Sequence, residues 1–210
     1  MKTACIDLDN TLANTSKMHL IAFKQAFKNY NLKPVSDKQI LSLFGLVSED
    51  MIKNLYPKVS RGLAEKITKE HNLIATTNTY KYATQIKGAD NALKYLRKKG
   101  YKIAIVSNSS MKEVKTVLKQ TKIKNYDIII AKEQVKHGKP AADGINLAKR
   151  IFNSKEAIII GDTTYDILAG KKAKVKTIAV LTGDDSRKKL MLYNPDYIIK
   201  DINQIKAIFK

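Results

Sequence analysis

The chain has 210 residues, 44% of them hydrophobic and 28% charged, and no stretch approaches the roughly 18 apolar residues of a membrane span, which excludes a membrane protein. Acidic residues within the first ten positions argue against a secretory signal, and the single cysteine, Cys5, excludes an internal disulfide, so we expect a cytoplasmic protein. The formal net charge of +20 comes mostly from dispersed lysines rather than from base-reading arginines, so we expect small anions as ligands instead of nucleic acid.

Two aspartates follow the first predicted strand. The apolar run 3–6 predicts a short buried strand, and Asp7 and Asp9 come directly after it. Residues spaced i and i+2 on an extended segment point the same way, so both carboxylates are expected on one side. Because neighbouring carboxylates repel each other, this pair predicts a bound cation or a shared proton at the end of the strand.

Residues 15–83 are predicted to be helical, since nothing in this stretch is typical of a strand. Pro34 ends the first helical pattern, and Ser36 with Gln39 forms the pattern of a capping box, which predicts the start of a second helix. Helical spacing or helix-start signals predict four helices, over residues 18–30, from residue 37 onward, and over residues 48–55 and 61–71.

From residue 88 onward, predicted strands and helices alternate. Gly100 marks the end of the first of these helices. Short apolar runs separated by helices predict an α/β fold, in which a mostly parallel sheet is covered by helices on both faces. The strands are predicted over residues 102–106, 127–131, 157–160, 177–181 and 197–199, and the helices over residues 89–99, 111–119, 142–152, 167–173 and the C-terminus.

Polar residues follow four of the predicted strands. Ligands of open parallel sheets bind beyond the carboxyl ends of the strands, so these residues are expected to meet at one edge of the sheet. The helix after the second of these strands could also hold an anion at its N-terminus. In chain order the set comprises Asp7 and Asp9 after the first strand, Ser107 and Asn108 after the second, Lys139 after the third, and Asp162 and Asp166 after the fourth.

This ordered set resembles the haloacid dehalogenase superfamily, in particular its phosphatases with a helical cap inserted after the first motif. The matching segments are Asp7-Leu8-Asp9-Asn10-Thr11 for the first motif, Ser107 for the second, Lys139-Pro140 for the third, and Gly161-Asp162 with Asp166 for the fourth. The resemblance covers essentially the whole chain. It implies a Rossmann-like core over residues 1–14 and 84–210, a helical cap over residues 15–83, Mg²⁺ as cofactor, and an aspartyl-phosphate intermediate.

The residue types suit that chemistry. Hydrolysis of a phosphate monoester needs a nucleophile, a proton donor for the leaving alcohol, and charge neutralisation on the phosphoryl group. Asp7 would form the covalent intermediate, and Asp9 would protonate the leaving oxygen and later activate water. The four aspartates outweigh Mg²⁺ and Lys139 by one negative charge, so an arriving phosphate dianion favours a protonated Asp9.

The other motif residues would bind the metal and the phosphoryl group. Lys139 would neutralise charge, and Ser107 and Asn108 would supply neutral donors to the phosphoryl oxygens. Thr11 would orient the first loop and is also expected to contact the substrate. The expected metal ligands are Asp7, Asp9 through its backbone carbonyl, and Asp162, with Asp166 as a water-mediated or supporting group.

The sequence leaves the substrate open. Asp9 favours a phosphate ester over a haloacid or a phosphonate, because the dehalogenases and phosphonatases of the superfamily lack an acid at this position. A small phosphorylated metabolite is expected, with phosphoglycolate suggested by branch resemblance. A sugar-phosphate mutase, or hydrolysis of nucleotides or pyrophosphate, stays open.

Two non-enzymatic classes also stay open. A receiver-like phosphoacceptor would share the clustered aspartates, although the helical insert and Asp9 argue against it. A nucleic-acid module rests on charge alone. Within the cap, residues 44–48 are predicted to face the substrate. His19, His71 and His137 show no metal-ligand spacing and are interpreted as surface or cap residues.

Overall fold

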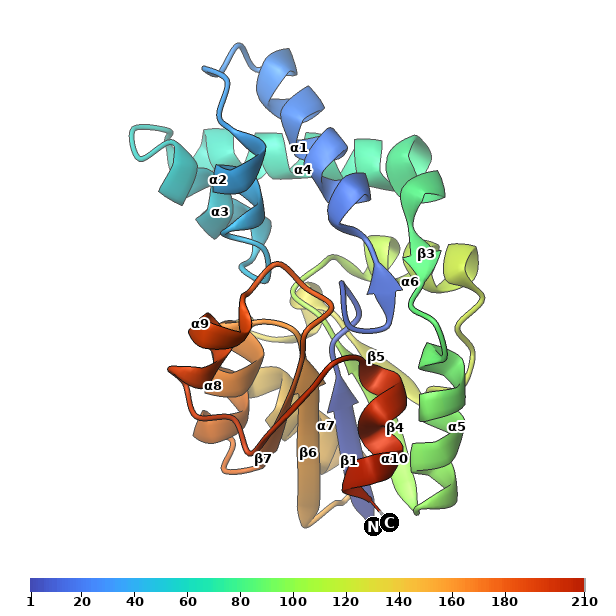
Figure 1. The fold of residues 1–210 in the computed structure, drawn as a ribbon. Coiled ribbons are helices and arrows are strands. Elements are labelled where there is room, and N and C mark those ends of the chain that lie inside the picture. Colours follow the sequence, from blue (N-terminus) through green and yellow to red (C-terminus); the bar gives the residue numbers. More distant parts are fainter. Residues whose placement is uncertain (210) are drawn as a thin grey trace.

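The computed structural model describes residues 1–209, which build a layer of helices on top of an α/β core (Figure 1). The main sheet has the strand order β5-β4-β1-β6-β7-β8, and every neighbouring pair is parallel. The predicted parallel α/β fold is therefore confirmed. Its strands are β1 (Lys2–Ile6), β4 (Tyr101–Val106), β5 (Ile128–Ile130), β6 (Glu156–Gly161), β7 (Lys176–Val180) and β8 (Tyr197–Ile199).

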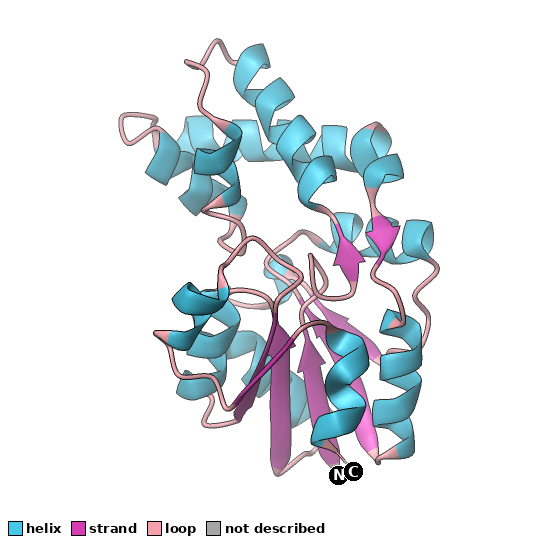
Figure 2. Ribbon diagram, viewed as in Figure 1, coloured by secondary structure: helices cyan, strands magenta, loops and turns pink. Residues whose placement is uncertain are grey.

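Helices cover both faces of this sheet (Figure 2). Alternate residues of β1 show why both faces are apolar: Ala4 and Ile6 join the core cluster under α5, α6 and α10, and Cys5 joins the cluster under α7 and α8. Gly100 has a φ of +82° and follows α5, as the sequence predicted. The helices and short 3₁₀ turns are α5 (Ala89–Lys98), α6 (Met111–Thr121), η2 (Lys132–Gln134), α7 (Asp143–Ile151), α8 (Thr164–Lys172), α9 (Arg187–Met191), η3 (Ile202–Gln204) and α10 (Ile205–Ile208).

A separate helical segment lies over the carboxyl ends of the strands (Figure 1). The chain leaves and re-enters the core through an antiparallel pair, β2 (Ala13–Asn14) and β3 (Thr84–Gln85). The expected capping box is present, because Ser36 Oγ accepts a hydrogen bond from Gln39 N at 3.3 Å and Gln39 Oε1 accepts one from Ser36 N at 2.9 Å. Between the two strands lie α1 (Ser16–Asn29), α2 (Asp37–Leu41), α3 (Ser48–Leu55), α4 (Arg61–Thr77) and η1 (Thr79–Tyr82).

The helical segment has its own hydrophobic cluster, built around Phe23, Phe27, Ile52 and Ile67. A hydrophobic core of its own is typical of a separate domain. The exact boundaries of this domain, residues 15–83, stay a prediction. Close to the β2–β3 pair the packing is different. There Met18, Ala22 and Ala75 of α1 and α4 join the main core cluster, so the two bodies share apolar packing on this side.

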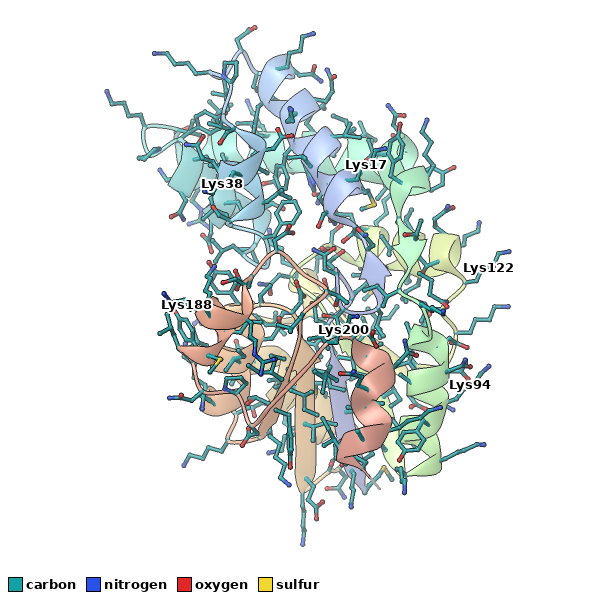
Figure 3. The ribbon with its side chains drawn as sticks, viewed as in Figure 1. Lys17, Lys38, Lys94, Lys122, Lys188 and Lys200 are labelled. Atoms are coloured by element: carbon teal, nitrogen blue, oxygen red, sulfur yellow. The ribbon has the colours of Figure 1, made fainter. Side chains whose placement is uncertain are left out.

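Lysines project into solvent from both the helical segment and the core. Figure 3 labels six of them, and they come from elements along the whole chain rather than from one face. This dispersion agrees with the absence of a long basic run in the sequence. Within residues 1–209, none of the helices has the length and apolar character needed to cross a membrane.

Candidate active site

A cavity lies between the carboxyl ends of the strands and the helical segment. It brings together seven of the eight predicted site residues, because the loops after β1, β4, β5 and β6 converge on it: Asp7, Asp9, Ser107, Asn108, Lys139, Asp162 and Asp166. The helical segment supplies the opposite wall through Phe44, Gly45, Leu46 and Ser48, which come from the loop 44–48 that the sequence predicted to face this site.

Lys139 joins two of the buried carboxylates. Its Nζ lies 2.5 Å from Asp7 Oδ1 and 2.6 Å from Asp166 Oδ1, and all three side chains are buried. Burial lowers the pKa of Lys139, but the neighbouring carboxylates Asp166 and Asp7 outweigh it, so the pKa of Lys139 is raised and the ammonium stays charged. The Lys139 ammonium therefore forms ion pairs with two carboxylates at the floor of the cavity.

Lys139 does not neutralise all of the carboxyl groups at the floor of the cavity. Burial, and then the charges of Asp166 and Asp9, raise the pKa of Asp7 to about 8 against the opposing effect of Lys139. Burial and the charges of Asp7 and Asp166 also raise the pKa of Asp162 well above its ordinary value. Buried carboxylates that resist ionisation indicate a place for a cation.

The donor atoms fit a hard divalent cation such as Mg²⁺. Asp162 Oδ1 accepts a hydrogen bond from Thr11 Oγ1 at 3.0 Å, which leaves Oδ2 for a metal. Asp166 is committed elsewhere: Oδ1 pairs with Lys139, and Oδ2 accepts from Thr163 N at 3.1 Å and Thr163 Oγ1 at 2.6 Å. Asp7 and Asp162 could therefore each offer a carboxylate oxygen to an ion, whereas both oxygens of Asp166 already have partners.

Asp9 is held by hydrogen bonds from both bodies. Its Oδ1 accepts from Thr15 Oγ1 at 2.8 Å and lies 3.3 Å from His19 Nε2, while Oδ2 accepts from Ser109 Oγ at 3.0 Å and Ser107 Oγ at 3.4 Å. Since both carboxylate oxygens are engaged, the backbone carbonyl of Asp9 is the better candidate for a metal.

Asp9 is ionised in the protein without substrate, whereas the sequence predicted that it is protonated when phosphate binds. Burial raises the pKa of Asp9, but the hydrogen bond and charge of His19 and the hydrogen bonds of Thr15 and Ser109 outweigh it and lower the pKa to about 2. Asp9 is therefore ionised before an anion arrives. The proton predicted from the charge count has to be taken up when the phosphate binds.

Two residues predicted to contact substrate have other contacts. Thr11 is fully buried outside the cavity lining, so its hydroxyl supports Asp162 instead. Asn108 uses its amide within the protein: Nδ2 donates to Gly45 O at 2.7 Å and to Lys139 O at 2.8 Å, and Oδ1 accepts from Lys139 N at 2.8 Å. Asn108 thereby ties the Lys139 loop to the helical segment.

Two of the three histidines have contacts at the cavity that the sequence did not indicate. His19 and His71 belong to the helical segment, as predicted, but they are buried and line the cavity. Together with Glu113 they also form a group whose ligand atoms lie within 4.8 Å of one another. His19 is found four residues after Thr15, one helical turn further on, and this spacing was the available signal. His137 alone is exposed.

Comparison with known proteins assigns the family. The family model of the haloacid dehalogenase-like hydrolases matches residues 5–180, which include all four motifs. The chain belongs to this family. The predicted resemblance and the prediction of an enzyme, a hydrolase, are thereby confirmed.

The relatives of this hydrolase carry different names. It is 28% identical to a pyrophosphatase PpaX of Oceanobacillus iheyensis over 99% of this chain and 96% of the relative. Two solved structures share the fold: a hydrolase of the haloacid dehalogenase-like family from Streptococcus pneumoniae (23% identity, TM-score 0.85, 99% and 98% coverage) and a predicted phosphoglycolate phosphatase from Haemophilus somnus (19% identity, TM-score 0.85, 100% and 98% coverage). The alignments span nearly the full length of each chain.

Proposed function

We propose that this hydrolase is a Mg²⁺-dependent phosphatase that acts on a small phosphate monoester through an aspartyl-phosphate intermediate. The observation that carries the proposal is the pairing of Asp7, buried against Lys139, with Asp9, held beside it at the same cavity. One carboxylate is positioned as a nucleophile next to a fixed cation. The other has the hydrogen-bond partners that would orient a general acid and base.

The reaction follows from these positions. The Asp7 carboxylate attacks phosphorus, and the bond between phosphorus and the ester oxygen breaks. Asp9 donates its proton to the leaving alcohol and then takes a proton from the water that attacks the aspartyl-phosphate, which releases phosphate and restores Asp7. Ser107 and the backbone amides after β4 would donate to the phosphoryl oxygens, and Lys139 keeps Asp7 oriented.

Mg²⁺ would be held by Asp7, Asp162 and the backbone carbonyl of Asp9, where it would neutralise charge on the phosphoryl oxygens. The raised pKa of Asp7, about 8, means that the metal-free folded protein keeps a proton that the unfolded chain loses near pH 4. Stability of the metal-free protein should therefore fall as the pH rises from about 4 to about 8.

Thermal unfolding in EDTA and in Mg²⁺ checks this pH dependence. At one fixed Mg²⁺ concentration, about 100 times the Kd at pH 8, Mg²⁺ should raise Tm by roughly 5–10 °C at that pH. The increase should be smaller near pH 6, because Mg²⁺ must then displace a proton from Asp7, which weakens its binding. Asp162→Asn should lose most of the increase. An increase that is independent of pH would contradict the assignment of Asp7 as a ligand.

The cavity wall favours an uncharged leaving group. Opposite the carboxylates lie Phe23, Phe44, Leu46 and Met51, and Lys139 is the single lysine or arginine among the described residues that line the cavity. His19 also lines the cavity, but its two ring nitrogens face Asp9 and His71. The carboxylate of phosphoglycolate or the second phosphate of pyrophosphate would therefore meet this apolar wall without a free cationic donor. We therefore favour the phosphate ester of a small uncharged alcohol over either of these.

A turnover assay on a panel of phosphorylated compounds tests the proposal. Phosphate release from p-nitrophenyl phosphate and from alkyl phosphates, dependent on Mg²⁺, is expected, with lower kcat/KM for phosphoglycolate and pyrophosphate. A mutase would instead convert a sugar phosphate to its isomer. Stoichiometric phosphorylation without release would identify a phosphoacceptor and overturn the proposal.

Gly183 gives a further test of the Asp162 position. A Cβ at this residue would lie 1.8 Å from Asp162 Oδ2, so Gly183→Ala must displace the carboxylate. Turnover should fall by about 10- to 100-fold with a higher Mg²⁺ requirement. Gly62→Ala is the matched control, because its Cβ meets nothing within 4 Å and it lies in α4. An unaltered Mg²⁺ requirement in Gly183→Ala would argue against Asp162 as a ligand.

A further inference from the structure

A chain of buried side chains runs from Asp9 into the protein. His19 of α1 has Nε2 at 3.3 Å from Asp9 Oδ1 and Nδ1 at 3.2 Å from His71 Nε2. His71 of α4 in turn has Nδ1 at 3.5 Å from Glu113 Oε1. Each imidazole therefore has one nitrogen toward each neighbour in the path. The four groups form one continuous path from the core loop after β1, through the helical segment, to α6 of the core.

The two carboxylate oxygens of Glu113 have different contacts. Its Oε2 closes the capping box of α6 by accepting from Ser110 N at 2.9 Å and from Ser110 Oγ at 2.7 Å. Its Oε1 is buried, makes no hydrogen bond within the described residues, and faces His71. A buried carboxylate oxygen without a hydrogen bond is costly, so its direction toward the imidazole calls for an explanation beyond the helix cap.

The acceptors around His71 decide its tautomer. Nδ1 faces Asn72 Oδ1 at 2.9 Å as well as Glu113 Oε1, and both are acceptors, so Nδ1 carries the hydrogen. Burial lowers the pKa of His71 to about 4, which keeps the ring neutral and its Nε2 without a proton. That nitrogen can then accept from His19 Nδ1.

The hydrogen bonds of His19 follow from its two neighbours. His19 Nδ1 faces the Nε2 of His71, which carries no hydrogen, and His19 Nε2 faces the Asp9 carboxylate. With Nδ1–H donated to His71 and Nε2–H donated to Asp9, both N–H groups of His19 are committed and its ring orientation is set. Phe23 stacks on His71 with the ring centroids 3.8 Å apart, which fixes the second ring as well.

We propose that His71 and Glu113 are positioning residues, which orient His19 and through it the carboxylate of Asp9. The inference rests on the proposed function, in which Asp9 is the general acid. Because His71 belongs to α4 and Glu113 to α6, the path is complete when the helical segment rests on the core. Asp9 is therefore aligned at the moment when the helical segment docks on the core.

The same side chains could instead hold a metal, since the ligand atoms of His19, His71 and Glu113 lie within 4.8 Å of one another. The shortest approach of Glu113 Oε1 to His71 is to Nδ1, while the nitrogen of His71 that faces His19 is Nε2. In a metal site one nitrogen of each histidine would turn to the ion, and a hydrogen bond of His71, either with His19 or with Asn72 Oδ1, would be lost. Hydrogen bonds use the two nitrogens as they stand, so we favour the path.

Glu113→Gln tests the positioning role, because glutamine keeps the capping box and replaces the acceptor facing His71 by an amide. An N–H at this place would favour the other tautomer of His71, which puts two donors between the histidines. kcat/KM reports the steps up to phosphoryl transfer. For an alkyl phosphate, whose alcohol needs a proton to leave, kcat/KM should fall about 10-fold or more.

The ratio between two substrates separates positioning from folding. For p-nitrophenyl phosphate, whose phenolate leaves without help from an acid, kcat/KM should change by less than about threefold. Because both substrates meet the same folded fraction, partial unfolding does not alter the ratio. Ser110→Ala is the control: it weakens the same helix cap and should lower Tm without changing the ratio. An unchanged ratio in Glu113→Gln would overturn the proposal.

An NMR measurement tests the path without turnover. Long-range ¹H–¹⁵N spectra of the histidine rings in the EDTA-treated protein should show His71 neutral with the hydrogen on Nδ1, and Glu113→Gln should shift this tautomer. His71 carrying its hydrogen on Nε2, or a pattern that forms only after Zn²⁺ is added, would overturn the path. If the wild type hydrolyses no phosphate ester, the proposed function fails, and the spectra still decide whether the path exists.

Discussion

Asp7→Asn is expected to lower turnover by at least about 10⁴-fold, because an amide cannot form the phosphorylated intermediate. Asparagine has the size of aspartate, so the cavity keeps its shape. It also removes one of the carboxylates that surround Lys139, and the pKa of Asp7, raised to about 8, shows that its charge is poorly accommodated without a metal. The metal-free variant should therefore be at least as stable as the wild type at pH 8.

Three measurements check this result together: steady-state turnover, trapping of a phosphorylated protein by acid quench, and Tm in EDTA. Asp37→Asn is a matched control, since Asp37 forms an exposed ion pair with Lys24 in the helical segment. It should leave turnover unchanged. A phosphorylated Asp7→Asn protein would place the nucleophile elsewhere and would contradict the assignment.

Lys139→Met is expected to have the largest combined effect on stability and activity. Its Nζ is the cation between Asp7 and Asp166, and its removal leaves buried carboxylates unpaired, which costs about 3–5 kcal/mol. Turnover should fall by about 10³-fold, since a fixed charge next to the transferred group is lost. Because carboxylates can take up protons in place of the ammonium, the loss of stability should be smaller at low pH.

Urea denaturation at two pH values, with turnover at saturating Mg²⁺, measures both effects. Lys189→Met provides the comparison, because the Lys189–Asp185 ion pair has the same 2.5 Å distance but a lysine that is 40% exposed. An exposed pair of this kind contributes at most about 1 kcal/mol. Equal losses of stability in the two variants would show that burial does not strengthen the Lys139 contacts.

Most of the core could be predicted from the sequence, because buried parallel strands leave a clear pattern. β1, β4 and β6 are continuous apolar runs that end at polar site residues, and the end of each strand places those residues at one edge. The short helix α9 was missed. Only Leu190 of its five residues is buried, so it has no apolar period to detect.

The finer contacts of the site could not be predicted because they join residues far apart in the chain. His19 and His71 are 52 residues apart, and no local pattern indicates that α1 and α4 bring Nδ1 of one to 3.2 Å from Nε2 of the other. Asn108 was predicted to bind the phosphoryl group because it follows a strand. The structure instead directs its amide to Gly45 and Lys139, which only the folded loops bring within reach.

The contacts between the helical segment and the core differ from one side of the cavity to the other. Beside β2 and β3 the contact is apolar, through Met18, Ala22 and Ala75. On the far side it includes the hydrogen bond from Asn108 to Gly45 and the partly exposed ion pair of Lys132 with Glu49. Water can replace each of these contacts at a cost of about 1 kcal/mol. We therefore expect the far side of the cavity to open first when the helical segment moves, with β2–β3 as the hinge.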